Sequence, residues 1–128
     1  PNDLRRPIAE ALDDVEFYFN TWQDAAGEVA IPYFNGDYVD QHPASMVFLV
    51  KNETAEALQQ LDMVSWAKPI HTRTDAERED MKRVVGELLD AAASIINLVG
   101  VLCREYRFSM KDIFKAWKLS LKLRKLNK

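Results

Sequence analysis

The sequence has few of the residues that mark disulfide-stabilised, exported or membrane proteins. It contains one cysteine, Cys103, so no internal disulfide can form. Only four glycines and five prolines interrupt its 128 residues, which leaves long stretches that can form helices. Residues 1–6 lack the apolar core of a secretory signal, and the longest apolar stretches are broken before they reach a membrane-spanning length. We therefore expect a soluble, cytoplasmic protein without a membrane segment.

The motifs of several large enzyme classes are also missing. The chain has no G-x-x-x-x-G-K-[ST] phosphate loop, no G-x-G-x-x-G and no G-x-S-x-G. His42 and His71 each lie beside a proline without a second histidine three or four residues away, so no zinc site is expected. Cys103 lies in an apolar run and is interpreted as a buried hydrophobic residue. Classical NTPases, Rossmann enzymes, serine hydrolases and zinc proteins are disfavoured.

The residues that are present predict a single all-α domain covering residues 1–128. A content of 48% hydrophobic and 29% charged residues is typical of a globular protein, and the length suits one domain. Apolar residues recur at steps of three and four, and no segment alternates as a strand does. The expected helices span residues 4–30, 43–66, 75–106 and 109–126. We predict a four-helix bundle, up-and-down by default.

Capping residues fix the start of two of these helices. Thr74 followed by Glu77 is a capping box that begins the third helix. Ser109 and Asp112 form a second, weaker pair at the start of the fourth. Asn52 could divide the second helix into two pieces, because its side chain competes for backbone hydrogen bonds.

The third helix becomes strongly apolar in its second half. Between residues 88 and 102 the only polar residues are Asp90, Ser94 and Asn97. A helix that is apolar all round has to be covered on nearly every side, so we predict that this helix is strongly buried. Three neighbouring helices cover such a segment with difficulty. We therefore expect a homodimer or a larger homo-oligomer.

Two pairs of acidic residues could bind a metal ion. Glu87 and Asp90 are three residues apart on the third helix, and Asp24 and Glu28 are four apart on the first, so each pair shares a helix face. Asp90 lies within an apolar run and needs a partner if it is buried. If the two helices are neighbours, four carboxylates converge into a site suited to Mg²⁺ or Mn²⁺. The alternative is that these acids belong to solvated or salt-bridged faces.

The segment Glu87-Leu88-Leu89-Asp90, followed by an apolar helix, resembles the E-x-x-D motif of the all-α NTP pyrophosphohydrolases, the MazG and dimeric dUTPase superfamily. Residues 24–30 are similar to its first motif, E-E-x-x-E, with Ala25 in place of the middle acid, and residues 108–117 resemble the next helix start. The resemblance implies Mg²⁺-dependent cleavage of a nucleoside triphosphate between its α and β phosphates. It implies the metal ligands Asp24, Glu28, Glu87 and Asp90, with Glu28 and Glu87 as catalytic residues.

The last helix carries a row of lysines on one face, at steps of four, three, four and three. These lysines are Lys111, Lys115, Lys118, Lys122 and Lys125. The superfamily's Lys-Asn pair would fall on Ser120 and Leu121, so phosphate contacts would come from Lys118, Lys122 or Arg124. Alternatively, the row is a solvated face. With a net charge of −3, nucleic-acid binding is not favoured for the chain as a whole.

A second class of function remains open at this point. The chain could be a noncatalytic, oligomeric helical-bundle module that binds protein or nucleic acid through its basic last helix. Such a module needs the same apolar third helix but no metal.

Overall fold

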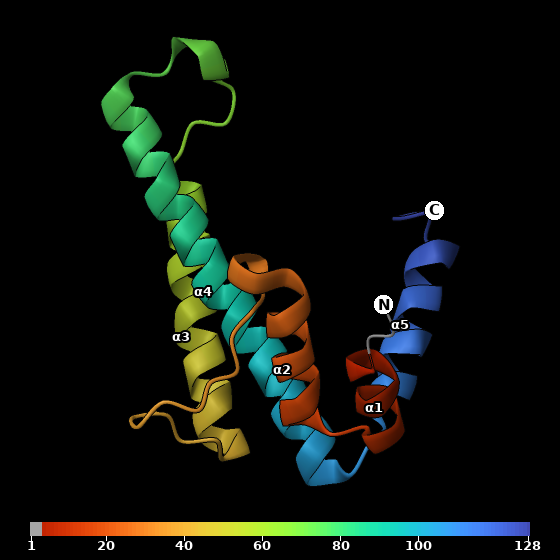
Figure 1. Ribbon diagram of the computed structural model, residues 1–128. Helices are drawn as coiled ribbons and strands as arrows, with labels where there is room; N and C mark the ends of the chain where they lie inside the picture. Colours follow the sequence, from red (N-terminus) through yellow and green to blue (C-terminus); the bar gives the residue numbers. More distant parts are fainter. Residues whose placement is uncertain (1–3) are drawn as a thin grey trace. The chain divides into compact units, whose positions relative to one another are not determined.

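A computed structural model describes residues 4–128, and within that range every regular element is helical (Figure 1). The predicted all-α class is confirmed, but residues 4–128 form five α-helices where four were expected. They are α1 (Arg5–Leu12), α2 (Val15–Ala26), α3 (Pro43–Asp62), α4 (Asp75–Tyr106) and α5 (Met110–Leu123), with short 3₁₀ turns η1 (Gly27–Val29) and η2 (Ile70–Thr72). The expectation that residues 1–6 form no secretory signal concerns residues 1–3 in part, and these three lie outside the described residues.

The chain divides into two compact units. The hairpin unit is Asp40–Leu98, and the terminal unit combines the residues up to Val39 with Val99–Lys128. Helix α4 supplies its first part to the hairpin unit and its last part to the terminal unit. Because each unit is defined by its own contacts, the up-and-down arrangement of a single bundle stays a prediction.

The first expected helix, residues 4–30, is not continuous. Asp13 adopts a left-handed conformation, with φ of 51°, and ends α1. Asp14 then begins α2, because its side chain accepts a hydrogen bond from the Phe17 amide at 2.9 Å. Gly27, with φ of 59°, ends α2. The prediction of one helix was wrong because two adjacent aspartates supply both a stop and a start.

The core of the terminal unit depends on a close approach of α2 to the end of α4. A Cβ atom added to Gly100 would lie 2.7 Å from Val15 Cγ1 and 3.3 Å from Phe19 Cε2. Phe19 also packs against Tyr33, with ring centroids 5.3 Å apart. Cys103 is buried as expected, and burial raises the pKa of its thiol. The thiol is therefore neutral and part of the packing.

Helix α5 is connected to α1 by a hydrogen bond at its first turn. Ser109 caps α5 by accepting a hydrogen bond from the Asp112 amide at 3.1 Å, as the sequence predicted. The Lys111 amide donates to the Asp13 carboxylate at 3.0 Å. Burial raises the pKa of Asp13, but hydrogen bonds from Ser109 and Lys111 outweigh this effect, and the pKa is lowered overall.

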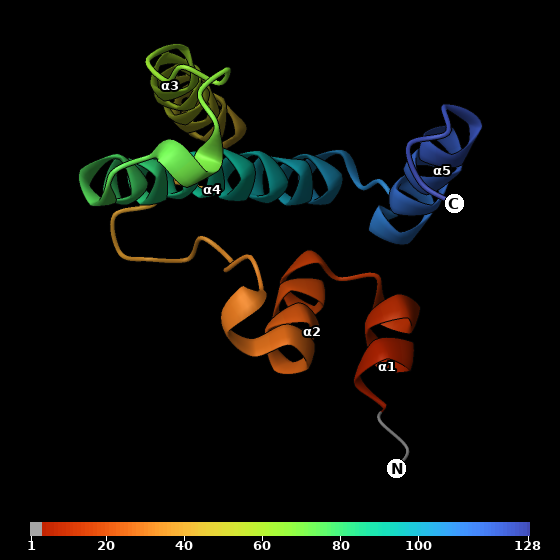
Figure 2. The ribbon, with the colours of Figure 1, turned by 90° about the horizontal axis from the view of Figure 1, so that it is seen from above.

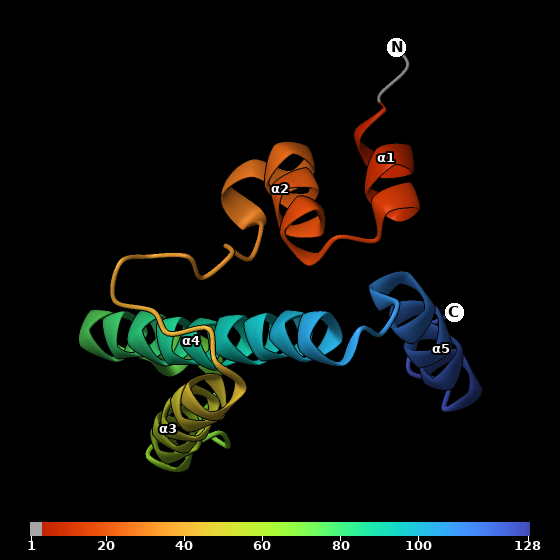
Figure 3. The same cartoon turned by 90° about the horizontal axis from the view of Figure 1, so that it is seen from below.

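The hairpin unit consists of α3 and the first part of α4, which lie side by side and run in opposite directions (Figures 1, 2 and 3). Helix α3 continues through Asn52, so the alternative of two pieces was wrong. The predicted capping box begins α4: the Glu77 amide donates to Thr74 Oγ1 at 3.2 Å, and the Thr74 amide donates to a Glu77 carboxylate oxygen at 3.3 Å.

The predicted strong burial of the third helix, now α4, is not confirmed. Leu88, Leu89 and Ile95 are 40%, 55% and 40% exposed in this single chain. Ser94 and Asn97 are buried, and each donates a hydrogen bond to a carbonyl of the same helix. The apolar surface of α4 therefore extends beyond what α3 covers.

The sequence predicted no apolar stretch of membrane-spanning length, but α4 contains one. By length and composition alone α4 could cross a membrane, and 39% of its most apolar window is buried. The core helix of a soluble protein passes the same test.

We expect Gly100→Ala to destabilise the protein, because the new methyl group overlaps Val15. The free energy of unfolding should fall by about 1–3 kcal/mol, as measured by urea denaturation. Gly86→Ala is the matched control, since it lies in the same helix and an added Cβ meets nothing within 4 Å. Gly86→Ala should raise the free energy of unfolding by up to about 1 kcal/mol, because alanine has a higher helix propensity than glycine. Equal stability of the two variants would contradict the packing described.

We expect Asp13→Asn to lower stability at neutral pH by about 1 kcal/mol, because a carboxylate at a helix amino terminus is replaced by a neutral group. Asparagine also tolerates the left-handed conformation, so the change isolates the charge. The folded-state pKa of Asp13 is lowered, so its contribution is present above the unfolded pKa of about 3.9 and disappears as pH falls through the folded value. Urea denaturation at neutral pH and near pH 2 should show the difference vanish in acid.

Candidate metal centre

Three glutamates of the hairpin unit meet between its two helices. Glu53 and Glu56 lie on α3, and Glu87 lies on α4, and one carboxylate oxygen from each is within 4.8 Å of the others. A spacing of three residues places Glu53 and Glu56 on one face of α3. The antiparallel neighbour α4 then brings Glu87 opposite them. The site is built entirely within one unit on regular helices.

The three carboxylates repel one another. One oxygen of Glu87, Oε2, is buried and has no hydrogen-bond partner among residues 4–128. The pKa of Glu53 is raised, first by burial and then by the negative charges of Glu56, Asp90 and Glu87. At such a separation two carboxylates repel by roughly 1 kcal/mol in water and by roughly 3 kcal/mol in a partly buried setting. A bound cation would remove this repulsion.

The chemistry of these side chains fits a hard divalent cation. Carboxylate oxygens are the preferred protein ligands of Mg²⁺, Mn²⁺ and Ca²⁺. Glu53 and Glu87 are half-buried, whereas Glu56 is exposed, so one side of the cluster opens to solvent. That open side leaves room for water or a phosphate oxygen to complete the coordination of an ion.

Only part of the predicted ligand set is found in this cluster. Glu87 is a member, and Asp90 is close enough to raise the Glu53 pKa. Asp90 is exposed, so the condition under which it would need a partner is not met. Glu53 and Glu56 were not predicted. Their spacing of three residues on a helix is the criterion that selected Glu87 and Asp90, and applying it to α3 would have found them.

The other predicted pair, Asp24 and Glu28, belongs to the terminal unit. Asp24 is exposed on α2 and forms an ion pair with Arg5 at 3.7 Å. Glu28 follows Gly27 and lies in η1, so the two acids do not share a helix face as predicted. Since Glu87 lies in the hairpin unit, a site formed by both pairs stays a prediction.

The predicted phosphate-binding residues are exposed at the carboxy-terminal end of the chain. Lys118 and Lys122 lie on α5, and Arg124 directly follows it. Their role stays a prediction. His42 has a structural role, since its Nδ1 accepts a hydrogen bond from the Ala44 amide and caps α3.

No protein-family model matches the chain, and neither the curated proteins nor the solved structures contain a significant match to it.

We expect Glu87→Gln to stabilise the metal-free protein by roughly 1 kcal/mol, because it removes one of three crowded negative charges. Urea denaturation in the presence of EDTA measures this change. Glu28→Gln is the matched control: it removes an exposed glutamate of the other unit and should change stability by less than about 0.5 kcal/mol. A loss of stability in Glu87→Gln without metal would show that its carboxylate has a favourable partner.

Proposed function

We propose that this chain is a metal-dependent nucleotide pyrophosphohydrolase whose Mg²⁺ or Mn²⁺ ion is held by Glu53, Glu56 and Glu87, with Asp90 beside them. The observation that supports this proposal is the approach of three carboxylates within 4.8 Å, one of which keeps a buried oxygen without a protein partner. Such an arrangement is unfavourable without a cation.

The acidic motifs agree with this choice of ligands. Glu87 and Asp90 have the E-x-x-D spacing of the all-α NTP pyrophosphohydrolases. The segment Asn52-Glu53-Thr54-Ala55-Glu56 has the spacing of their E-E-x-x-E motif, with Asn52 at the first position. We prefer Glu53 and Glu56 to Asp24 and Glu28 as ligands because they face Glu87 within one unit. The departure at Asn52 removes one acid that the family motif would provide.

The chain's own residues then have separate tasks. Glu53, Glu56 and Glu87 hold the ion from two rigid helices, and the exposed side of the cluster admits the triphosphate. When bound, the ion polarises phosphate oxygens and lowers the pKa of water, which favours attack between the α and β phosphates. Lys118, Lys122 and Arg124, the phosphate contacts expected from the sequence, belong to the terminal unit, and their role stays a prediction.

A second candidate function is supported by the uncovered face of α4. Val85, Leu88, Ala92 and Ile95 follow one another at steps of three, four and three, the spacing with which a helix presents a seam to another helix. Three of these four are exposed large apolar residues. This seam suits a homodimer, and it would equally serve a noncatalytic module in the cytoplasm. A dimer is therefore compatible with both candidate functions.

The proposal predicts release of pyrophosphate from a nucleoside triphosphate in the presence of Mg²⁺ or Mn²⁺. A panel of ribo- and deoxynucleotides should be assayed separately for pyrophosphate and for orthophosphate, because the two products report different cleavage positions. Glu87→Gln and Glu53→Gln should each reduce turnover by at least about 100-fold, since even outer-shell changes at metal sites cost 10–100-fold. Asp24→Asn and Glu28→Gln are matched controls and should keep near wild-type turnover.

A metal titration of thermal unfolding distinguishes failure of binding from failure of catalysis. At 100 times its dissociation constant a bound ion stabilises the protein by about 2.7 kcal/mol, and Glu87→Gln should abolish that gain. Stabilisation by the metal ion without turnover would mean that the chain binds metal but does not hydrolyse nucleotides. Neither gain nor turnover would overturn the metal centre, and loss of turnover in Glu28→Gln but not in Glu53→Gln would restore the ligand set expected from the sequence.

A further inference from the structure

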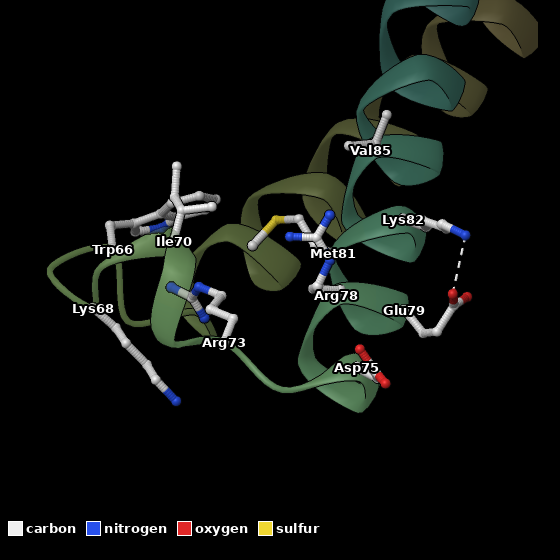
Figure 4. A pocket seen from close by; sticks show the side chains of 10 residues that line it. All are labelled: Trp66, Lys68, Ile70, Arg73, Asp75, Arg78, Glu79, Met81, Lys82 and Val85. Carbon is white, nitrogen blue, oxygen red and sulfur yellow. Dashed lines mark hydrogen bonds and ion pairs between the residues drawn. The ribbon is translucent and has the colours of Figure 1, made fainter.

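A groove lies in the hairpin unit between the start of α4 and the connector that precedes it (Figure 4). It is open to solvent and has a volume of about 840 Å³. Trp66 and Ile70 form one wall, and Met81 and Val85 of α4 form the other. Charged side chains surround this apolar interior: Lys68, Arg73, Arg78 and Lys82, with Asp75 and Glu79.

Trp66 is held by a hydrogen bond but remains largely exposed. Its indole Nε1 donates a hydrogen bond to the Leu61 carbonyl at 2.9 Å, which uses its single donor and fixes the ring. The residue is nevertheless 58% exposed, and the neighbouring Ile70 is 77% exposed. A fixed indole with no free donor offers a ligand only its π face and edges. It is suited to stacking on a planar ring.

The cations around the groove differ in how firmly they are held. Lys68 and Arg73 both contact Glu77, at 2.7 Å and 3.5 Å. Lys82 pairs with Glu79 at 3.0 Å on the surface, on the side of α4 away from Trp66 (Figure 4). The Arg78 guanidinium, which is exposed, has no ion pair or side-chain hydrogen bond within the described part of the chain. Arg78 is therefore available to an anion.

The groove is separate from the acidic cluster. Arg78 and Glu87 are nine residues apart on α4, which is two and a half helical turns, so they lie on opposite sides of the helix. A phosphate bound in the groove would be kept away from the three glutamates. The balance of charge also limits the ligand: four cations against Asp75, Glu77 and Glu79 leave one net positive charge, which suits one phosphate group better than three.

We propose that this groove binds a purine nucleoside 5′-monophosphate at a second site, distinct from the proposed metal centre. The base stacks on Trp66 with Met81 opposite it, and the phosphate is bound by Arg78. The fixed indole selects a flat aromatic ring, and the unpaired guanidinium beside it selects the attached anion.

Isothermal titration with AMP in the presence of EDTA tests this proposal, because metal binding at the acidic cluster cannot contribute. Trp66→Ala should weaken AMP binding by roughly tenfold, in line with the loss of one stacked base. Trp66→Phe retains an aromatic ring, so its affinity for AMP should lie between those of the wild type and Trp66→Ala. Arg78→Gln should weaken AMP binding several-fold and reduce its dependence on salt. Adenosine and inorganic phosphate, each lacking half of the ligand, should bind much more weakly than AMP.

Arg83→Gln is the matched control, since Arg83 is an exposed arginine of the same helix that does not line the groove. It should bind AMP as the wild type does, and so should Glu87→Gln, which affects only the metal centre. Circular dichroism shows whether the variants are folded. The proposal is overturned if AMP does not bind at millimolar concentration, if Trp66→Ala binds it unchanged, or if a single-stranded oligonucleotide binds where AMP does not. Burial of the groove by a second copy, detected as AMP affinity that falls with protein concentration, also overturns it.

Discussion

The arrangement of the hairpin unit depends on the contacts of one carboxylate, that of Glu77. It accepts hydrogen bonds from the Thr74 amide and hydroxyl at the start of α4 and also from Lys68 Nζ, while Arg73 lies within ion-pair distance. These contacts lower the pKa of Glu77, first through Lys68. The connector is thereby joined to the first turn of α4 at several points. The direction in which α4 returns along α3, and with it the meeting of Glu53 and Glu87, follows from this junction.

Helix α4 has different chemistry on its different sides. Towards α3 it presents Glu87, which completes a negative cluster. On the opposite side it presents Arg78, which lines the same groove as Trp66. The apolar residues Leu88 and Ile95 lie on a third side, between those of Glu87 and Arg78, and are partly exposed in the single chain. One helix thus separates an environment suited to cations from one suited to anions, and its regular backbone keeps the two apart.

The sequence predicted what depends on local chemistry. Both capping pairs, the class of fold and the extent of α4 follow from residues within one or two turns of each other, and all are present. The failures are of two kinds. The break at Asp13 was missed because an apolar repeat continues across it, although adjacent aspartates can end and begin a helix. The cluster of Glu53 with Glu87 depends on which helix faces which, and that is decided by packing between residues distant in sequence.

The division of the chain into a contiguous and a discontinuous unit has a consequence for the order of folding. The hairpin unit needs only residues 40–98, and its defining contacts at Glu77 span three to nine residues, so loop closure is inexpensive. The terminal unit requires segments from both ends of the chain, for example the Lys111 amide with the Asp13 carboxylate. During synthesis, α1 and α2 cannot complete these contacts until α5 has been made. We therefore expect the α3–α4 hairpin to form first, and the packing around Gly100 to be the late step that completes the native state.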